Sequence, residues 1–172
     1  MKNITILLGV GLVSLLAGCS STPVALSPVG PNPVGYESHA SGGELQVFSR
    51  LIGRSEGNNP SWFQHTGYSI YYPDGKLLKQ VDNTTGHYAS SPRRMILPAG
   101  KYVVMAQTND RLWVEVPAII ESGHTTRIHL DDNWKLPTDA SQQELVRLPN
   151  GNPVGWLAGT TETTGFGSGA AR

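Results

Sequence analysis

The stretch GYSIYYPDGKLLKQV (residues 67–81) has the strongest local structural pattern in the sequence. Tyr68, Ile70 and Tyr72 alternate with residues of the opposite face, as expected of a half-buried β-strand. Residues 73–75 (Pro-Asp-Gly) then predict a tight turn, because proline presets φ, aspartate bonds locally and glycine accepts a positive φ. Apolar residues continue beyond the turn as a returning strand. The stretch therefore predicts a β-hairpin.

Similar signals for strand, turn and strand recur along the central part of the chain. The stretch RRMILPAGKYVVMAQ predicts strands at residues 94–97 and 101–107 around a Pro-Ala-Gly turn. Alternating segments at 44–51, 111–120 and 125–130 predict further strands. We count seven candidate strands and no helix. This spacing of short strands and turns predicts an all-β fold, either a β-sandwich or a β-barrel.

The strand TTRIHL shows the expected division of faces most clearly, because successive side chains of a strand point to opposite sides. Thr126, Ile128 and Leu130 are expected to face the core. Arg127 and His129 lie in the opposite phase and are expected to face solvent.

Two motifs in this region resemble a known family. MILPAGKYVVMAQ and VEVPAIIESGHTTRIHLD are similar to the C-terminal half of carboxypeptidase-regulatory-like, or transthyretin-like, domains. The resemblance covers roughly residues 44–132 and implies a seven-stranded antiparallel sandwich of transthyretin-like or immunoglobulin-like form. Tyr102 is expected to be structural, with a buried ring and a hydroxyl bonded to the backbone. The long segments 52–65 and 82–91 depart from the family pattern.

The first eighteen residues predict a secretory signal. Lys2 precedes an apolar run over residues 4–17, which is too short to span a bilayer comfortably but suits a signal peptide. The run ends in Leu-Ala-Gly-Cys, which resembles the bacterial lipobox. The resemblance implies cleavage between Gly18 and Cys19 and attachment of diacylglycerol to the Cys19 sulfur, and Ser20 is similar to the residue in lipoproteins sorted to the outer membrane. The alternative is an unmodified cysteine after a plain signal anchor.

Composition divides the chain into segments. The expected segments are a signal peptide (1–18), a lipid-anchored flexible tether (19–43), the β-sandwich domain (44–132), a C-terminal extension with a hairpin (133–158) and a disordered tail (159–172). The tether is expected to be flexible because it is rich in proline, serine and glycine and lacks apolar periodicity. The string NPVG occurs at 32–35 and again at 152–155. The repeat has two explanations. Either turn segments share these residues because their composition is biased, or both copies dock on the domain.

Composition and motifs argue against several classes of function. The formal net charge of zero offers no basic excess for nucleic acid. We find no nucleophile elbow, zinc-protease helix, P-loop or dinucleotide fingerprint, and the five histidines lack metal-ligand spacing. Asp82, Asp131 and Asp132 could offer oxygen ligands to Ca²⁺, or simply form a solvated end of the sandwich. We therefore expect no catalytic activity, no cofactor and no metal.

Aromatic residues are the remaining candidates for binding: Trp62, Phe63, Tyr71 and Tyr88. They lie in the long segments or on the polar phase of a strand. Such rings stack on sugars or anchor protein partners, or else cover the long segments as a satellite core. We expect a non-catalytic binding or structural module that contacts the membrane through its lipid and an envelope protein or glycan. A carbohydrate-binding module is the alternative.

Overall fold

The computed structural model describes residues 22–33, 42–54, 62–85, 91–136 and 144–159. These residues form twelve strands and no α-helix, so the expected all-β class is confirmed. No helix in this part of the chain is long and apolar enough to cross a membrane. The strands are β1 (Val24–Ala25), β2 (Gly43–Phe48), β3 (Leu51–Arg54), β4 (Trp62–His65), β5 (Tyr68–Tyr71), β6 (Leu77–Val81), β7 (Arg94–Leu97), β8 (Gly100–Gln107), β9 (Trp113–Ile120), β10 (Thr125–His129), β11 (Leu145–Arg147) and β12 (Pro153–Trp156).

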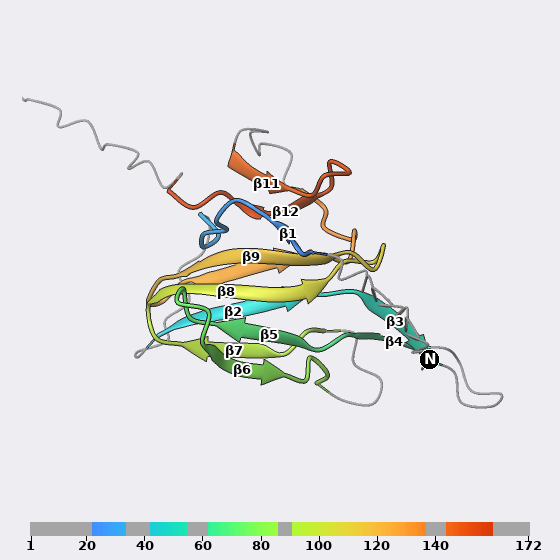
Figure 1. Cartoon of the computed structure of the whole chain (residues 1–172), viewed down its shortest axis with the longest axis horizontal. Coiled ribbons are helices and arrows are strands. Elements are labelled where there is room, and N and C mark those ends of the chain that lie inside the picture. The colour runs from blue at the N-terminus through green and yellow to red at the C-terminus, as the bar shows by residue number, and fades with distance from the viewer. Residues whose placement is uncertain (1–21, 34–41, 55–61, 86–90, 137–143, 160–172) are drawn as a thin grey trace, which may run out of the picture.

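The strands form two main sheets and two hairpins (Figure 1). The larger sheet has the order β1-β9-β8-β5-β6, and the smaller has the order β10-β2-β7. Ile70, Val104 and Val116 of the larger sheet are fully buried. They share one core with Leu45 and Ile128 of the smaller sheet, so the two sheets pack face to face as in a β-sandwich. The hairpin β3–β4 extends from one end (Figure 1). In the hairpin β11–β12, β12 packs against β10 and lies beside the N-terminal segment that follows β1.

Both main sheets are mixed rather than antiparallel. β1 pairs with β9, and β10 pairs with β2, in parallel, whereas the other neighbours are antiparallel. The detailed expectation of seven antiparallel strands is therefore not confirmed. Alternation along the chain predicts that a segment is a strand, but strand direction depends on which distant segment it pairs with. β2 and β10 come from opposite ends of the predicted domain.

The predicted inward faces are largely confirmed. Thr126, Ile128 and Leu130 are completely buried, as expected. Tyr72 is an exception, because it lies past the end of β5 and is 39% exposed. His129 is the other exception, since it lies on the outward phase of β10 and is still buried. The physical reason is that the C-terminal segment covers this face, with the Trp134 ring stacked on His129.

The predicted turn at residues 73–75 has the expected geometry. Gly75 has a φ of 84°, the left-handed conformation that glycine adopts without strain. The Tyr72 N–H donates to the Lys76 carbonyl at 2.9 Å and closes the hairpin. Tyr102 is also structural as expected, because its ring is buried and its hydroxyl donates to the Pro98 carbonyl at 3.0 Å.

The N-terminal segment differs from the expected flexible tether over residues 19–43. Its described residues 22–33 lie along β9 and contribute β1, and its last residue, Gly43, begins β2. Val29 is completely buried. The Val29 N–H donates to the Pro117 carbonyl and its carbonyl accepts from the Ile119 N–H, both at 2.8 Å. One buried valine and a few backbone hydrogen bonds fasten a segment whose composition resembles a linker.

The hairpin β11–β12 meets this N-terminal segment. The Gly30 N–H donates to the Trp156 carbonyl at 2.8 Å, and the Ala158 N–H donates to the Pro28 carbonyl at 2.9 Å. A Cβ at Gly155 would lie 2.5 Å from a Val29 methyl carbon, so the close approach requires glycine. The described parts of both NPVG copies therefore lie in segments that dock on the domain. The expected disordered tail, apart from residue 159, lies outside the described residues.

Candidate functional site

The structure locates only part of the predicted site. Cys19, Gly18 and Tyr88 lie outside the described residues, and so does the side chain of Trp62, whose backbone belongs to β4. Phe63 is 55% exposed on the β3–β4 hairpin. Tyr71 is the remaining predicted binding residue, and it lines a pocket on the outer face of the larger sheet.

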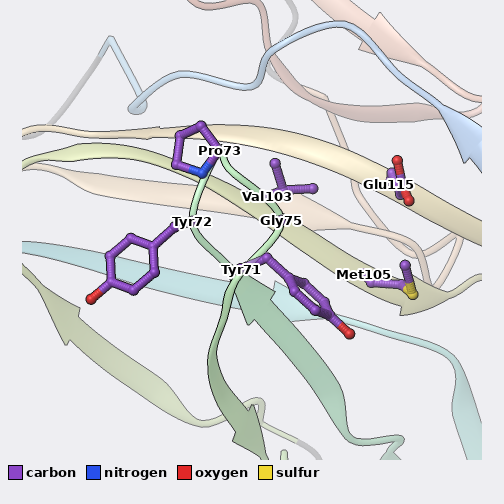
Figure 2. A pocket seen from close by; sticks show the side chains of 7 residues that line it. All are labelled: Tyr71, Tyr72, Pro73, Gly75, Val103, Met105 and Glu115. Atoms are coloured by element: carbon purple, nitrogen blue, oxygen red, sulfur yellow. The ribbon is translucent and has the colours of Figure 1, made fainter.

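This sheet-face pocket has a volume of about 320 Å³. Its lining residues come from the β5 end, the following turn and the neighbouring strands: Tyr71, Tyr72, Pro73, Gly75, Val103, Met105 and Glu115. Figure 2 shows the turn at one side of the pocket and the strands β8 and β9 behind it. Two tyrosines, three apolar side chains and one carboxylate among the described residues thus line a shallow, accessible space.

Sheet register explains how these side chains meet. Tyr71 pairs with Val103 of β8, and Met105 pairs with Glu115 of β9. All four are half-buried residues on the outward phase, opposite the core. In Figure 2 the Tyr71 ring extends toward the side of Met105, whereas the Tyr72 ring points away on the other side of the turn.

The turn forms the remaining wall of the pocket. A β-bulge between Ile70 and Tyr71 shifts the register against β6 at the point where the chain leaves the sheet. The Lys76 N–H donates to the Asp74 side chain at 3.0 Å, which holds the turn in shape. Because the turn is braced by these local contacts, Pro73 is held in place at the pocket's edge.

Comparison of the chain with family models, curated proteins and solved structures finds no match. The chemistry of the site therefore has to be argued from its own residues. Among the described residues, the lining contains one carboxylate and no histidine, serine or cysteine. Across the described residues, no group of three or more His, Cys, Asp or Glu side chains is arranged to hold a metal ion.

A second hollow adjoins the sheet-face pocket on the larger sheet. It has a volume of about 450 Å³ and includes Ser69, Gln80 and Trp113 in its lining. Ser69 pairs with Met105, so the two hollows are neighbours in the sheet. Trp113 is 40% exposed. The two neighbouring hollows therefore form a more extended accessible surface on this face of the sheet than the sheet-face pocket alone.

A buried polar cluster lies on the opposite side of the molecule, outside the smaller sheet. His129 is stacked between Phe48 and Trp134, with ring centroids 4.2 Å and 4.7 Å away. Its Nδ1 is 3.9 Å from an Asp131 carboxylate oxygen. Burial lowers the pKa of His129 to about 3 and raises the pKa of Asp131. The stacked imidazole contributes to packing on this side of the molecule, and it also borders a small pocket of about 90 Å³.

Sequence reasoning identified Tyr71 and missed Tyr72, Val103, Met105 and Glu115. One signal was present in the sequence, because Val103 and Met105 occupy the outward phase of β8, where polar residues are usual on a solvated face. Nothing in the local sequence around Glu115 indicates that it belongs to a binding site. Its position beside Met105 follows from the pairing of β8 with β9.

Proposed function

We propose that this protein is a lipid-anchored component of the cell envelope whose β-sandwich is a non-catalytic binding module. The proposal for binding rests on one observation, the sheet-face pocket with its aromatic, apolar and acidic lining. Concave sites with a mostly apolar lining and few polar groups are typical of ligand binding. The partner we propose first is an envelope protein.

The lining chemistry supports binding over catalysis. Hydrolysis of glycosidic bonds commonly uses two carboxyl groups on either side of the bond, and Glu115 is the single carboxylate among the described lining residues. A nucleophile activated by a base is also missing from these lining residues. Tyr71, Val103 and Met105 can exclude water from an apolar ligand without reacting with it.

The anchoring part of the proposal is supported by the sequence alone. Lys2, the apolar run over residues 4–17 and the lipobox-like ending at Cys19 occur together in the right order. Ser20, in place of aspartate, supports sorting to the outer membrane. Two or more acyl chains on one residue would hold the protein stably at a bilayer.

A carbohydrate-binding module is the second candidate. The observation in its favour is the half-buried Tyr71, whose ring borders the pocket and could stack on a sugar. Phe63 offers a second exposed ring, but it lies outside the pocket lining. A glycan in this pocket would therefore rely on Tyr71, because the Tyr72 ring points away (Figure 2).

Site-specific photo-crosslinking tests the binding function. A benzoylphenylalanine introduced at Tyr71 should form one discrete covalent adduct in the native envelope, because the position borders the pocket. The same substitution at Phe63 is a matched control, since that aromatic residue is exposed but does not line the pocket. Equal adducts at both positions, or none at Tyr71, would contradict the proposal.

A further inference from the structure

We propose that the sheet-face pocket binds a basic side chain, lysine or arginine, within an extended segment of a partner protein. This inference rests on the proposed binding function and specifies the chemistry of the ligand. The aliphatic part of the side chain lies on Val103 and Met105, and the cationic group pairs with Glu115. Tyr71 covers the remaining side.

The carboxylate of Glu115 defines the charge of the ligand. Glu115 is half-buried on β9, between Met105 of β8 and Ala25 of β1. In the described part of the chain, no basic side chain is within ion-pair distance of this carboxylate. A partly buried carboxylate has lost some of its hydration, and a cation in the pocket replaces that lost interaction.

The rest of the lining suits the stem of a basic side chain. Val103 and Met105 are successive outward residues of β8 and form an apolar floor. Methionine adapts its unbranched side chain to ligands of varied shape. Tyr71 adds an aromatic ring, which attracts a cation over its face. Lysine and arginine combine an apolar stem with a charged end, which matches this order of groups.

The extent of the surface favours a protein segment over a free amine. The second hollow begins at Ser69, directly beside Met105, and reaches the exposed Trp113. An extended chain can place one basic side chain in the sheet-face pocket and further residues along this hollow. A small amine would leave the second hollow empty.

A neutral glycan fits the lining less well. Sugar hydroxyl groups need several directed donors and acceptors, and buried groups without partners are costly. From its described lining residues, the pocket offers the carboxylate of Glu115 and the hydroxyl of Tyr71, because the Tyr72 ring points away (Figure 2). A neutral sugar also leaves Glu115 without a counter-charge.

Methionine methyl groups provide a direct test. The chain has three methionines, of which Met105 lines the pocket and Met95 lies in the core. We would label the methionine methyl groups of the full-length protein in detergent with ¹³C and titrate Ac-Ala-Ala-Lys-Ala-Ala-NH₂. The Met105 signal should shift to saturation while the Met95 signal stays fixed. The norleucine peptide, which lacks the charge, should bind at least about fivefold more weakly.

Two variants check the role of the carboxylate. Glu115→Gln should weaken the binding of the lysine peptide by at least about fivefold and leave the binding of the norleucine peptide unchanged. Glu121→Gln is the matched control, because Glu121 is an exposed carboxylate at the end of the same strand, and it should bind like the parent.

The outcomes separate this inference from the function on which it rests. Chitotetraose, titrated in the same way, serves as the neutral glycan probe. Equal binding of the lysine and norleucine peptides, or a shift of Met105 only with chitotetraose, would overturn the cationic ligand but keep a binding pocket. No shift of Met105 with any of these probes would overturn both.

Discussion

At the residue scale, His129 shows how burial changes the behaviour of a titratable group. The imidazole is stacked between Phe48 and Trp134, and the Arg127 guanidinium adds positive charge nearby. Desolvation is the main cause that lowers its pKa from 6.5 to about 3. The folded protein therefore keeps His129 neutral over a pH range in which the unfolded chain protonates it.

The stability of the fold should consequently decrease in acid. Between about pH 6.5 and pH 3 the unfolded state takes up a proton at His129 that the folded state does not, so the free energy of unfolding falls as the pH falls. The raised pKa of Asp131 acts in the opposite direction, because the folded state then binds that proton first. In the His129→Phe variant the free energy of unfolding should fall less steeply with decreasing pH than in the parent protein, by up to about 1.4 kcal/mol per pH unit. Urea denaturation at several pH values measures this slope.

The control for this experiment is His124→Phe. His124 lies on the turn before β10, and its Nδ1 contacts the Ser122 carbonyl at 3.1 Å near solvent. This variant should keep the acid dependence of the parent protein. The same pH slope in His129→Phe and in the parent would show that the buried imidazole is not its cause.

At the element scale, the N-terminal segment adds β1 to the edge of the larger sheet, next to β9, which contains a proline. Pro117 lies inside β9, where a proline removes one ladder hydrogen bond. Its carbonyl accepts from Val29, so its missing N–H faces the same N-terminal segment. β1 ends at Ala25, and the irregular chain after it passes Pro117 without needing that donor. The N-terminal segment can therefore pack along β9 although Pro117 offers no N–H donor.

Removal of the Val29 side chain tests whether this segment contributes to stability. Val29→Ala should lower the free energy of unfolding by about 2 kcal/mol, because the side chain is completely buried and leaves a cavity. Ser27→Ala is the control within the same segment, since Ser27 is exposed, and it should change stability by less than about 0.5 kcal/mol. Both are measured by urea denaturation. Equal, small effects would mean that the segment is only loosely attached.

At the scale of the whole molecule, docking of residues 22–33 shortens the link to the proposed anchor. Only residues 20–23 separate Cys19 from the start of β1 at Val24. Five residue steps span at most about 18 Å when fully extended. In the proposed anchored form the sandwich therefore lies close to the bilayer surface, rather than at the end of a long linker.

The anchor itself is tested by Cys19→Ser. This variant should lose incorporation of labelled fatty acid and should leave the membrane fraction or accumulate unprocessed, because serine offers no thiol for the thioether. Ser20→Ala keeps the cysteine and should be labelled like the parent protein. Membrane attachment that persists in Cys19→Ser would indicate a different anchor.

Much of the fold could be predicted because its signals are local. Alternation at Tyr68 and Ile70, and the glycine that accepts a positive φ at Gly75, depend only on neighbouring residues and are confirmed. Part of the site could also be predicted, since Tyr71 lies on the outward phase of the same strand. The remaining lining residues come from strands that meet Tyr71 only through pairing.

The sequence by itself predicted seven of the eight strands of the two main sheets and the tight turn, because each depends on a short stretch of chain, but not β1 or the β3–β4 hairpin. The proposed anchor at Cys19 rests on the sequence in the same way. Only the tertiary structure decided that β2 and β10 run parallel and that Val29 docks beside Pro117. It also decided that Glu115 faces the pocket with Tyr71. Each of these outcomes joins residues far apart in the sequence, so it depends on packing that no local pattern records.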